Sequence, residues 1–154
     1  MEGQQTYSSA GSVLDSSQAW SGGSNSVGEY LQIDLDNAAQ IVGTVVQGRA
    51  DADEWVTSYT VQHSMDEVTW VTAPGTFSGN SDRDTRGSNM LQQTVHARYI
   101  RIYPQTWHGQ MSMRAGVVVQ AGKIIGKGLA DRGKPLDVLD SCFEVLDVDV
   151  GEGG

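Results

Sequence analysis

The chain is poor in several residue types, and each shortage excludes a class of protein. Cys142 is its single cysteine, so an internal disulfide cannot form. No run of about 18 apolar residues occurs, which excludes a membrane-spanning helix. The first residues, MEGQQTYSS, hold neither a basic nor an apolar stretch, so the sequence predicts no secretory signal peptide.

Positive charge is also scarce. Ten Lys and Arg residues stand against nineteen Asp and Glu residues, which gives a net charge of −9. Residues 1–119 contain no Lys at all. This excess of negative charge repels phosphate backbones and anionic lipid headgroups, so we expect no nucleic-acid binding and no membrane insertion.

Motifs of known catalysis are missing as well. The chain contains no HExxH, GxSxG, paired CxxC or GxxxxGK[ST] pattern. His63, His96 and His108 lie far apart in the sequence. We therefore predict that the protein is not an enzyme.

The chain is rich in short, alternating segments that are separated by turn residues. Such segments, with frequent Gly, are typical of an antiparallel β-sandwich or barrel. We expect strands at residues 30–35, 41–47, 55–64, 68–71, 90–95, 98–103 and 111–119. Alternation places Trp55, Tyr59 and Val61 on one face of the third segment, and Pro104 is expected to end the sixth.

Composition changes after residue 119. Residues 120–134 are Gly-rich and indicate a linker, and residues 135–154 form an acidic and aliphatic tail. In the tail, apolar residues recur at steps of three and four positions, which is typical of a helix. We expect a short helix or disorder there, although the β-branched residues would also fit a strand. We predict that the β-sandwich of residues 1–119 folds without the tail. The alternative is that residues 143–150 pair with an exposed strand edge.

A series of motifs, in a fixed order over roughly a hundred residues, resembles the discoidin domain, also called the coagulation-factor 5/8 type C domain. They are Ala19-Trp20, residues 28–35 (GEYLQIDL), 41–43, 47–49, 55–59, Phe77-Ser78-Gly79-Asn80, residues 97–104 (ARYIRIYP), Trp107 and Met113-Arg114. The resemblance implies a jelly-roll-like, galactose-binding-like β-sandwich without catalytic activity. It also implies that loops at one end bind glycans, phospholipid headgroups or other proteins.

The chain departs from the family pattern in three places. The two cysteines that usually tie the ends of the domain together are absent. The stretch before Ala19 is short, which puts the first strand and the first ligand loop in doubt. The acidic residue expected near Gly116 is also missing.

Three loops hold the candidate ligand residues, which are Asn25, Arg49, Asp51, Asp53, Glu54, Trp107 and His108. A guanidinium among carboxylates offers the mixture of donors and acceptors that glycan hydroxyls need, and an aromatic ring offers a face for stacking. Two alternatives stay open: Arg49 could simply neutralise its neighbours, and Trp107 could pack in the core.

Other polar residues are expected to be structural. Asn80 and Asp82 should cap their own loop, and Arg98, Arg101 and Arg114 should form structural salt bridges. No cofactor is expected, with calcium as a weak possibility at Asp15, because one carboxylate cannot supply six to eight oxygens.

These observations predict a non-catalytic recognition or adhesion module that binds a glycan or glycoprotein, outside the cell or at its surface, as a fragment of a larger protein. The alternative is an intracellular scaffold domain, favoured by the missing disulfide and signal peptide. Its tail could then dock on a protein partner through Leu136, Leu139, Phe143 and Leu146. Phospholipid-headgroup binding ranks third.

Overall fold

The computed structural model describes residues 4–6, 12–120 and 124–126, and this part of the chain is almost entirely β-strand. The strands are β1 (Gln4–Thr6), β2 (Trp20–Ser21), β3 (Tyr30–Gln47), β4 (Trp55–Ser64), β5 (Val71–Thr72), β6 (Phe77–Ser78), β7 (Gly87–His108), β8 (Ser112–Val119) and β9 (Ile124–Gly126). The prediction of an all-β fold is confirmed. Within the described ranges, no helix has the length and apolarity needed to cross a membrane.

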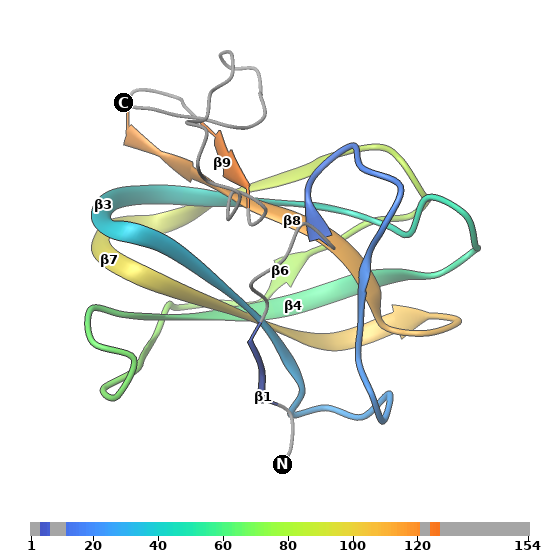
Figure 1. The fold of residues 1–154 in the computed structure, drawn as a ribbon, viewed down its shortest axis with the longest axis horizontal. Coiled ribbons are helices and arrows are strands. Elements are labelled where there is room, and N and C mark those ends of the chain that lie inside the picture. The colour runs from blue at the N-terminus through green and yellow to red at the C-terminus, as the bar shows by residue number, and fades with distance from the viewer. Residues whose placement is uncertain (1–3, 7–11, 121–123, 127–154) are drawn as a thin grey trace.

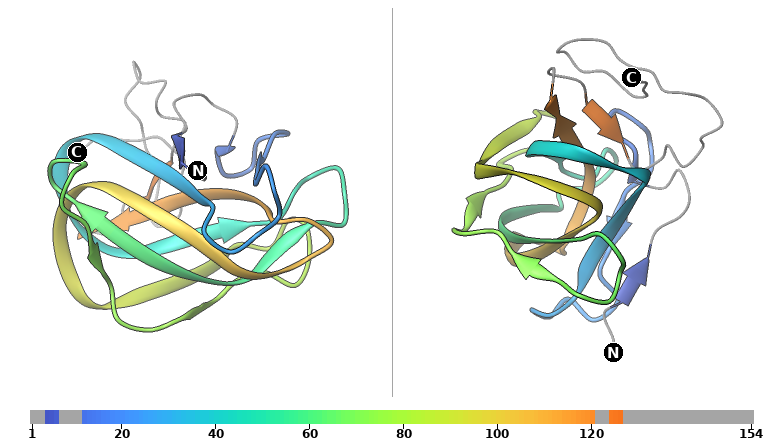
Figure 2. Two further views of the ribbon diagram at one scale, coloured as in Figure 1. Left: turned by 90° about the horizontal axis from the view of Figure 1, so that it is seen from below. Right: turned by 90° about the vertical axis from the view of Figure 1, so that its left-hand side faces the viewer.

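The strands follow the order β2-β8-β3-β7-β4-β5, and neighbours in this order pair antiparallel. β1 adds to β3 in parallel, while β6 pairs with β4 and β9 pairs with β8. Figures 1 and 2 show that the long strands β3 and β7 bend and wrap around a common core. Each therefore contributes to both layers of an antiparallel β-sandwich: the start of β3 pairs with the later part of β7, and its end pairs with β8 and the start of β7.

Two predicted strand breaks are wrong. Residues 30–35 and 41–47 belong to one strand, β3, whose register with β7 shifts between Asp34 and Ala39. Residues 90–103 likewise belong to one strand, β7, which continues past Pro104. Pro104 lies opposite Tyr59, where the register of β4 also shifts, so the missing proline N–H falls at an irregular point of the ladder. Of the predicted strand at 68–71 only Val71 lies in a strand, β5, so this prediction is wrong for residues 68–70.

The same shift changes which side chains of β4 face the core. Val56, Tyr59 and Val61 are completely buried, whereas Trp55 is half-buried. The predicted single face of Trp55, Tyr59 and Val61 is therefore wrong, because the irregularity between Val56 and Tyr59 adds one residue to the alternation. It places Trp55 at the end of the sandwich, beside the loops.

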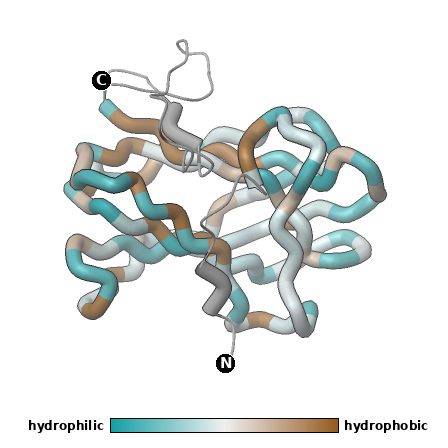
Figure 3. Tube along the Cα trace, viewed as in Figure 1, coloured by the Kyte–Doolittle hydropathy of each residue, from teal (hydrophilic) through white to brown (hydrophobic). Residues whose placement is uncertain are grey.

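One large hydrophobic cluster fills the space between the layers. Its fully buried members include Leu31, Ile33, Ile41, Val56, Tyr59, Val61, Ile100, Ile102, Met113, Ala115 and Val117. Figure 3 shows hydrophobic and hydrophilic stretches alternating along the strands, as one-sided burial requires. The sandwich is thus held by apolar burial, which leaves its loops free to carry polar chemistry.

Short segments extend the sandwich at its edges. Leu14 packs with Val45 and Val118 in a second small cluster, which brings the segment before β2 onto the outer side of β3 and β8. β9 lies inside residues 120–134, the predicted linker. The division into domain, linker and tail stays a prediction, because Cys142 and residues 135–154 lie outside the described residues.

Candidate functional site

Five polar segments gather at one end of the sandwich, and we call them the loop end. They are residues 12–18, 21–29, 48–54, 79–86 and 109–111. In Figure 1 the connections from β3 to β4 and from β7 to β8 project together at the right-hand side.

Glycines let these connections approach closely. Gly109 has a φ of +76°, and a Cβ there would lie 2.8 Å from the carbonyl oxygen of Asp53. A Cβ at Gly48 would lie 2.7 Å from the carbonyl oxygen of Asp82. Real side chains are excluded by such contacts, so glycine at these two positions brings the segment 48–54 against both of its neighbours.

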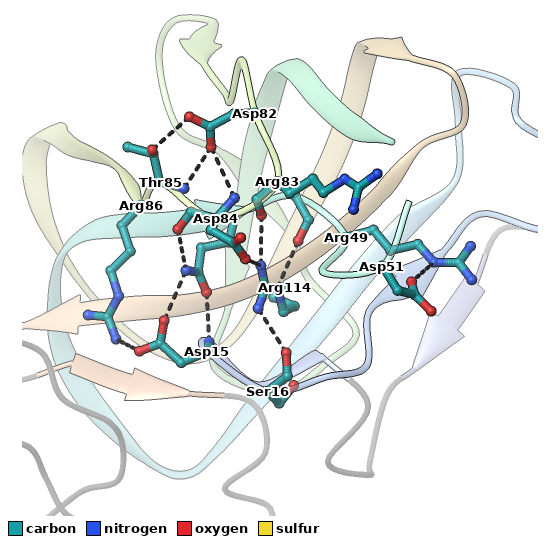
Figure 4. A network of polar contacts seen from close by, with 12 residues as sticks. Asp15, Ser16, Arg49, Asp51, Asp82, Arg83, Asp84, Thr85, Arg86 and Arg114 are labelled. Atoms are coloured by element: carbon teal, nitrogen blue, oxygen red, sulfur yellow. Dashed lines mark hydrogen bonds and ion pairs between the residues drawn. The ribbon is translucent and has the colours of Figure 1, made fainter. Parts of the chain in front are cut away.

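Arg114, the third residue of β8, fixes three segments of the loop end at once (Figure 4). Its side chain is only 2 % exposed. Nε donates to the carbonyl of Gly48 at 2.8 Å, Nη1 to that of Ser16 at 2.8 Å and Nη2 to that of Arg83 at 2.7 Å. Nη2 also pairs with Asp84 at 2.9 Å. The predicted structural ion pair of Arg114 is confirmed, and most of its donors hold backbone.

Asp15, the weak calcium candidate, is engaged by neighbouring side chains. Its Oδ2 lies 2.6 Å from Nη2 of Arg86, and its Oδ1 accepts a hydrogen bond from Nε2 of Gln47 at 3.0 Å. The described residues contain no group of three His, Cys, Asp or Glu side chains placed to hold a metal ion. The residues around Asp15 therefore do not fit a calcium site, which requires several oxygen ligands.

Asn80 and Asp82 cap their own loop, as predicted. Asn80 donates from Nδ2 to the carbonyls of Val46 and Thr85, at 2.9 and 3.0 Å. Asp82 accepts from the amides of Asp84 and Thr85 and from the Thr85 hydroxyl. These hydrogen bonds lower the pKa of Asp82. The loop is therefore shaped before any ligand arrives.

Arg49 forms an ion-paired fork on the surface of the loop end. Nε contacts Oδ1 of Asp51 at 2.7 Å and Nη1 contacts Oε1 of Glu54 at 3.0 Å. The side chains of Arg49 and Asp51 are 37 % and 66 % exposed. Hydrogen bonding to Arg49 lowers the pKa of Asp51, so this carboxylate stays ionised at neutral pH. Arg49 does neutralise its neighbours, but its Nη2 donates to no other described residue, and the side chain of Asp51 stays open to solvent.

The two remaining acidic candidates connect segments. Glu54 also accepts from the hydroxyl of Ser112 at 3.0 Å, which joins the segment 48–54 to β8. Asp53 is exposed and pairs with Arg83 at 2.8 Å, which joins it to the segment 79–86. Both carboxylates therefore position the loop, and Asp53 still presents its second oxygen to solvent.

An aromatic surface lies beside this fork, although not where the sequence predicted it. Trp55 and His108 face each other across β4 and β7 with ring centroids 4.4 Å apart and planes 12° from parallel. His108 is exposed, whereas Trp107 is half-buried and packs against the core. Trp107 therefore packs against the core, and Trp55, which was not predicted as a ligand residue, forms the aromatic surface with His108. The feature of the sequence that could have indicated this role is the polar segment 48–54, which immediately precedes Trp55.

Asn25 joins the segment 21–29 to the rest of the loop end. Its Oδ1 accepts from the amide of Met111 at 2.9 Å, and its φ is +53°. Glu29 holds the start of the same segment by accepting from the amides of Gly23 and Ser24 and from the Ser24 hydroxyl. Burial opposes ionisation of Glu29, but these hydrogen bonds outweigh it and lower its pKa.

The structure therefore brings most predicted residues together. Arg49, Asp51, Asp53, Glu54 and His108 lie at the loop end, where donors, acceptors and an aromatic ring are adjacent. Asn25 lies there too, with its carbonyl oxygen engaged by the backbone. This arrangement can hydrogen-bond a polyol at fixed positions.

Comparison with known proteins gives three findings. The model of the F5/8 type C domain matches residues 2–117. Retinoschisin of Mus musculus is 37% identical over 112 residues, which cover 68% of this chain and 50% of the relative. Discoidin II of Dictyostelium discoideum is similar in structure, with a TM-score of 0.64 and 28% identity over 70% of this chain and 47% of that one.

A family 32 carbohydrate-binding module from Clostridium perfringens, solved in complex with galactose, has the same fold. Its TM-score is 0.54 at 17% identity, covering 70% of this chain and 82% of the module. The chain spans half or less of the length of the retinoschisins and lactadherins that it matches.

Proposed function

We propose that this chain, which belongs to the F5/8 type C domain family, is a non-catalytic recognition module that binds a glycan or glycoprotein through its loop end. One observation carries the proposal. The exposed fork of Arg49 and Asp51 lies on the same loop as Glu54, and the backbone of this loop contacts the turn after the exposed imidazole of His108. A sugar hydroxyl can accept from Nη2 of Arg49 and donate to Oδ2 of Asp51 at the same time.

Charge supports a neutral glycan over an acidic one. The segments 48–54 and 79–86 carry five carboxylates and three guanidinium groups, and Arg83 and Arg86 are paired with acids. The carboxylates are Asp51, Asp53, Glu54, Asp82 and Asp84. A phosphate or sialic acid would therefore meet like charge, which disfavours a phospholipid headgroup as the ligand.

The test is calorimetric titration with galactose and lactose, preceded by a glycan array to select tighter neutral ligands. Arg49→Ala and Asp51→Ala should each weaken binding about tenfold, because each removes a hydrogen bond to a charged group. Asp66→Ala is the matched control, since it removes an exposed aspartate from the opposite end of the sandwich. Unchanged binding in both loop variants would remove this loop from consideration.

We further propose that the module acts outside the cell or at its surface, within a longer protein. The support for a longer protein is that the chain spans only part of its relatives. Detection of the full-length protein by surface labelling of intact cells tests this proposal, and labelling only after permeabilisation would favour the intracellular scaffold instead.

A further inference from the structure

A second cluster of aromatic and polar side chains lies outside the core and away from the loop end. It sits on the outer side of the sheet formed by β3, β7 and β4, where Leu31, Ile100 and Ile102 point inward and their neighbours point outward. We call it the aromatic face, and its members are Tyr30, Trp70, Tyr99, Arg101 and Tyr103.

Arg101 is the centre of the aromatic face. Its guanidinium carbon lies 4.2 Å from the ring centroid of Tyr30 and 3.8 Å from that of Trp70. Nε donates to Oε1 of Gln32 at 2.9 Å and Nη1 donates to the hydroxyl of Tyr103 at 3.3 Å. Among the described residues no carboxylate lies within ion-pair distance of Arg101, so the predicted salt bridge of Arg101 is not found in this part of the chain. The two rings supply the stabilisation instead.

Three of the five N–H groups of Arg101 are left without a partner among the described residues. This sets Arg101 apart from the other arginines of residues 12–120. Arg49, Arg83, Arg86, Arg98 and Arg114 all contact carboxylates. The aromatic face therefore offers a fixed donor group whose hydrogen-bonding capacity is not used within the domain.

Neighbouring side chains hold this donor group in place. Gln32, only 2 % exposed, donates from Nε2 to Glu67 at 2.6 Å, which orients its oxygen toward Arg101. The hydroxyl of Tyr103 donates to Gln62 at 3.1 Å. The ring centroids of Tyr30 and Tyr103 lie 5.0 Å apart. Groups that are ordered before binding lose little entropy when a ligand arrives, so such a face is suited to recognition.

We propose that the aromatic face is a second glycan-binding surface, separate from the loop end, and that it takes a neutral oligosaccharide. Trp70, Tyr99 and Tyr103 are half-buried, so each keeps part of its ring exposed for contact with a sugar. Arg101 supplies donors and the carboxylate of Glu67 supplies an acceptor beside them. Glu67 also disfavours an anionic ligand, because it places a negative charge where that ligand would bind.

The two surfaces are too far apart to share one sugar. Arg101 and His108 lie on the same strand, seven residues apart, which corresponds to roughly 23 Å of extended chain. A monosaccharide therefore occupies one surface or the other, and the tryptophan residues can report them separately. Trp55 belongs to the loop end, Trp70 to the aromatic face, and Trp20 is buried in the core.

The test is titration of the ¹⁵N-labelled chain with galactose and with lactose, following the indole N–H signals of the tryptophans. The signal of Trp70 should shift in a saturable way with lactose, and the shift should persist in Arg49→Ala. Arg101→Lys should raise the Kd read at Trp70 about tenfold and leave the titration at Trp55 unchanged, because lysine keeps the charge but loses the planar fork. An unshifted Trp20 signal shows that the variant is folded.

Two results would overturn the proposal. One is a Trp70 signal that does not shift at lactose concentrations that saturate the shift of the Trp55 signal. That result would leave only the loop-end proposal. The other is a Trp70 shift that has the same Kd as the Trp55 shift and is weakened to the same extent in Arg49→Ala. As a second variant, Trp70→Phe in the Arg49→Ala background should lower the remaining heat of lactose binding, and an unchanged heat would contradict the aromatic face as one of its sources.

Discussion

The loop end and the turn of residues 65–69 lie at opposite ends of the sandwich and are held in different ways (Figure 1). At the loop end, Arg114 bonds to Ser16 across 98 positions of sequence. In the turn, Asp66 accepts from the amides of Val68 and Thr69, two and three positions away. The loop end is therefore a product of the whole fold, whereas the turn is determined by its own few residues. Substitutions at the loop end should spread across several segments, and substitutions in the turn should stay local.

Arg114→Met should produce the largest effect, because it removes one side chain that holds three segments. The carbonyl of Gly48 would lose its donor in a buried place, and those of Ser16 and Arg83 would lose theirs in partly buried ones. We expect a loss of about 3–5 kcal/mol in the free energy of unfolding, measured by urea denaturation, together with loss of ligand binding. Arg86→Met, which removes a more exposed guanidinium, is the control. A loss below about 1 kcal/mol would contradict the role of Arg114.

Gly48→Ala should produce the next largest effect. The new Cβ would lie 2.7 Å from the carbonyl oxygen of Asp82 and 2.9 Å from Cβ of Trp55, so backbone must move. We expect about 1–3 kcal/mol of destabilisation and weaker ligand binding, since the two loops would separate. Thermal unfolding and titration of the same sample measure both. Destabilisation without any change in affinity would show that loop spacing does not matter to the ligand.

Glu29 provides a pH test of the segment 21–29. Its folded pKa lies below the ordinary value of 4.5, so its stabilising contribution is present above that value and is lost as pH falls through the folded pKa. Glu29→Gln should cost about 1–2 kcal/mol at pH 7. The free energies of unfolding of variant and wild type should converge in urea titrations carried from pH 7 to below 4. A difference that does not depend on pH would refute the role of the carboxylate.

Asp66→Ala should produce the smallest effect, because its hydrogen bonds are local and exposed. They lower the pKa of Asp66, which shows that they favour its ionised form. We expect a small fall in Tm and no change in galactose affinity at the loop end. In ¹H–¹⁵N spectra the shifted amides should lie within residues 64–72, and changes at residues 48–54 would break the contrast between the two ends.

The same contrast explains what the sequence could predict. The turn at Met65 and Asp66 and the capping by Asp82 were predictable, since both depend on side chains that bond to nearby amides. The place of Trp55 was not, because the irregularity in β4 arises from pairing with β7, more than 40 positions away. The continuation of β7 through Pro104 depends on that same irregularity.

Side-chain partners from distant strands were equally hidden. Alternation along β7 places Arg101 on one face with Tyr99 and Tyr103, but nothing in the local sequence indicates that Trp70 covers the guanidinium. The gathering of the candidate ligand residues was predictable only through the family resemblance, because their segments are separated by whole strands. The choice of ligand among glycans stays a prediction.

A structure of the domain with bound galactose tests the central claim most directly. Our account predicts the sugar at the loop end, in contact with the ring of His108 and with hydroxyls on Nη2 of Arg49 and Oδ2 of Asp51. A structure in which galactose occupies only other surfaces, while the loop end is accessible and empty, would contradict it.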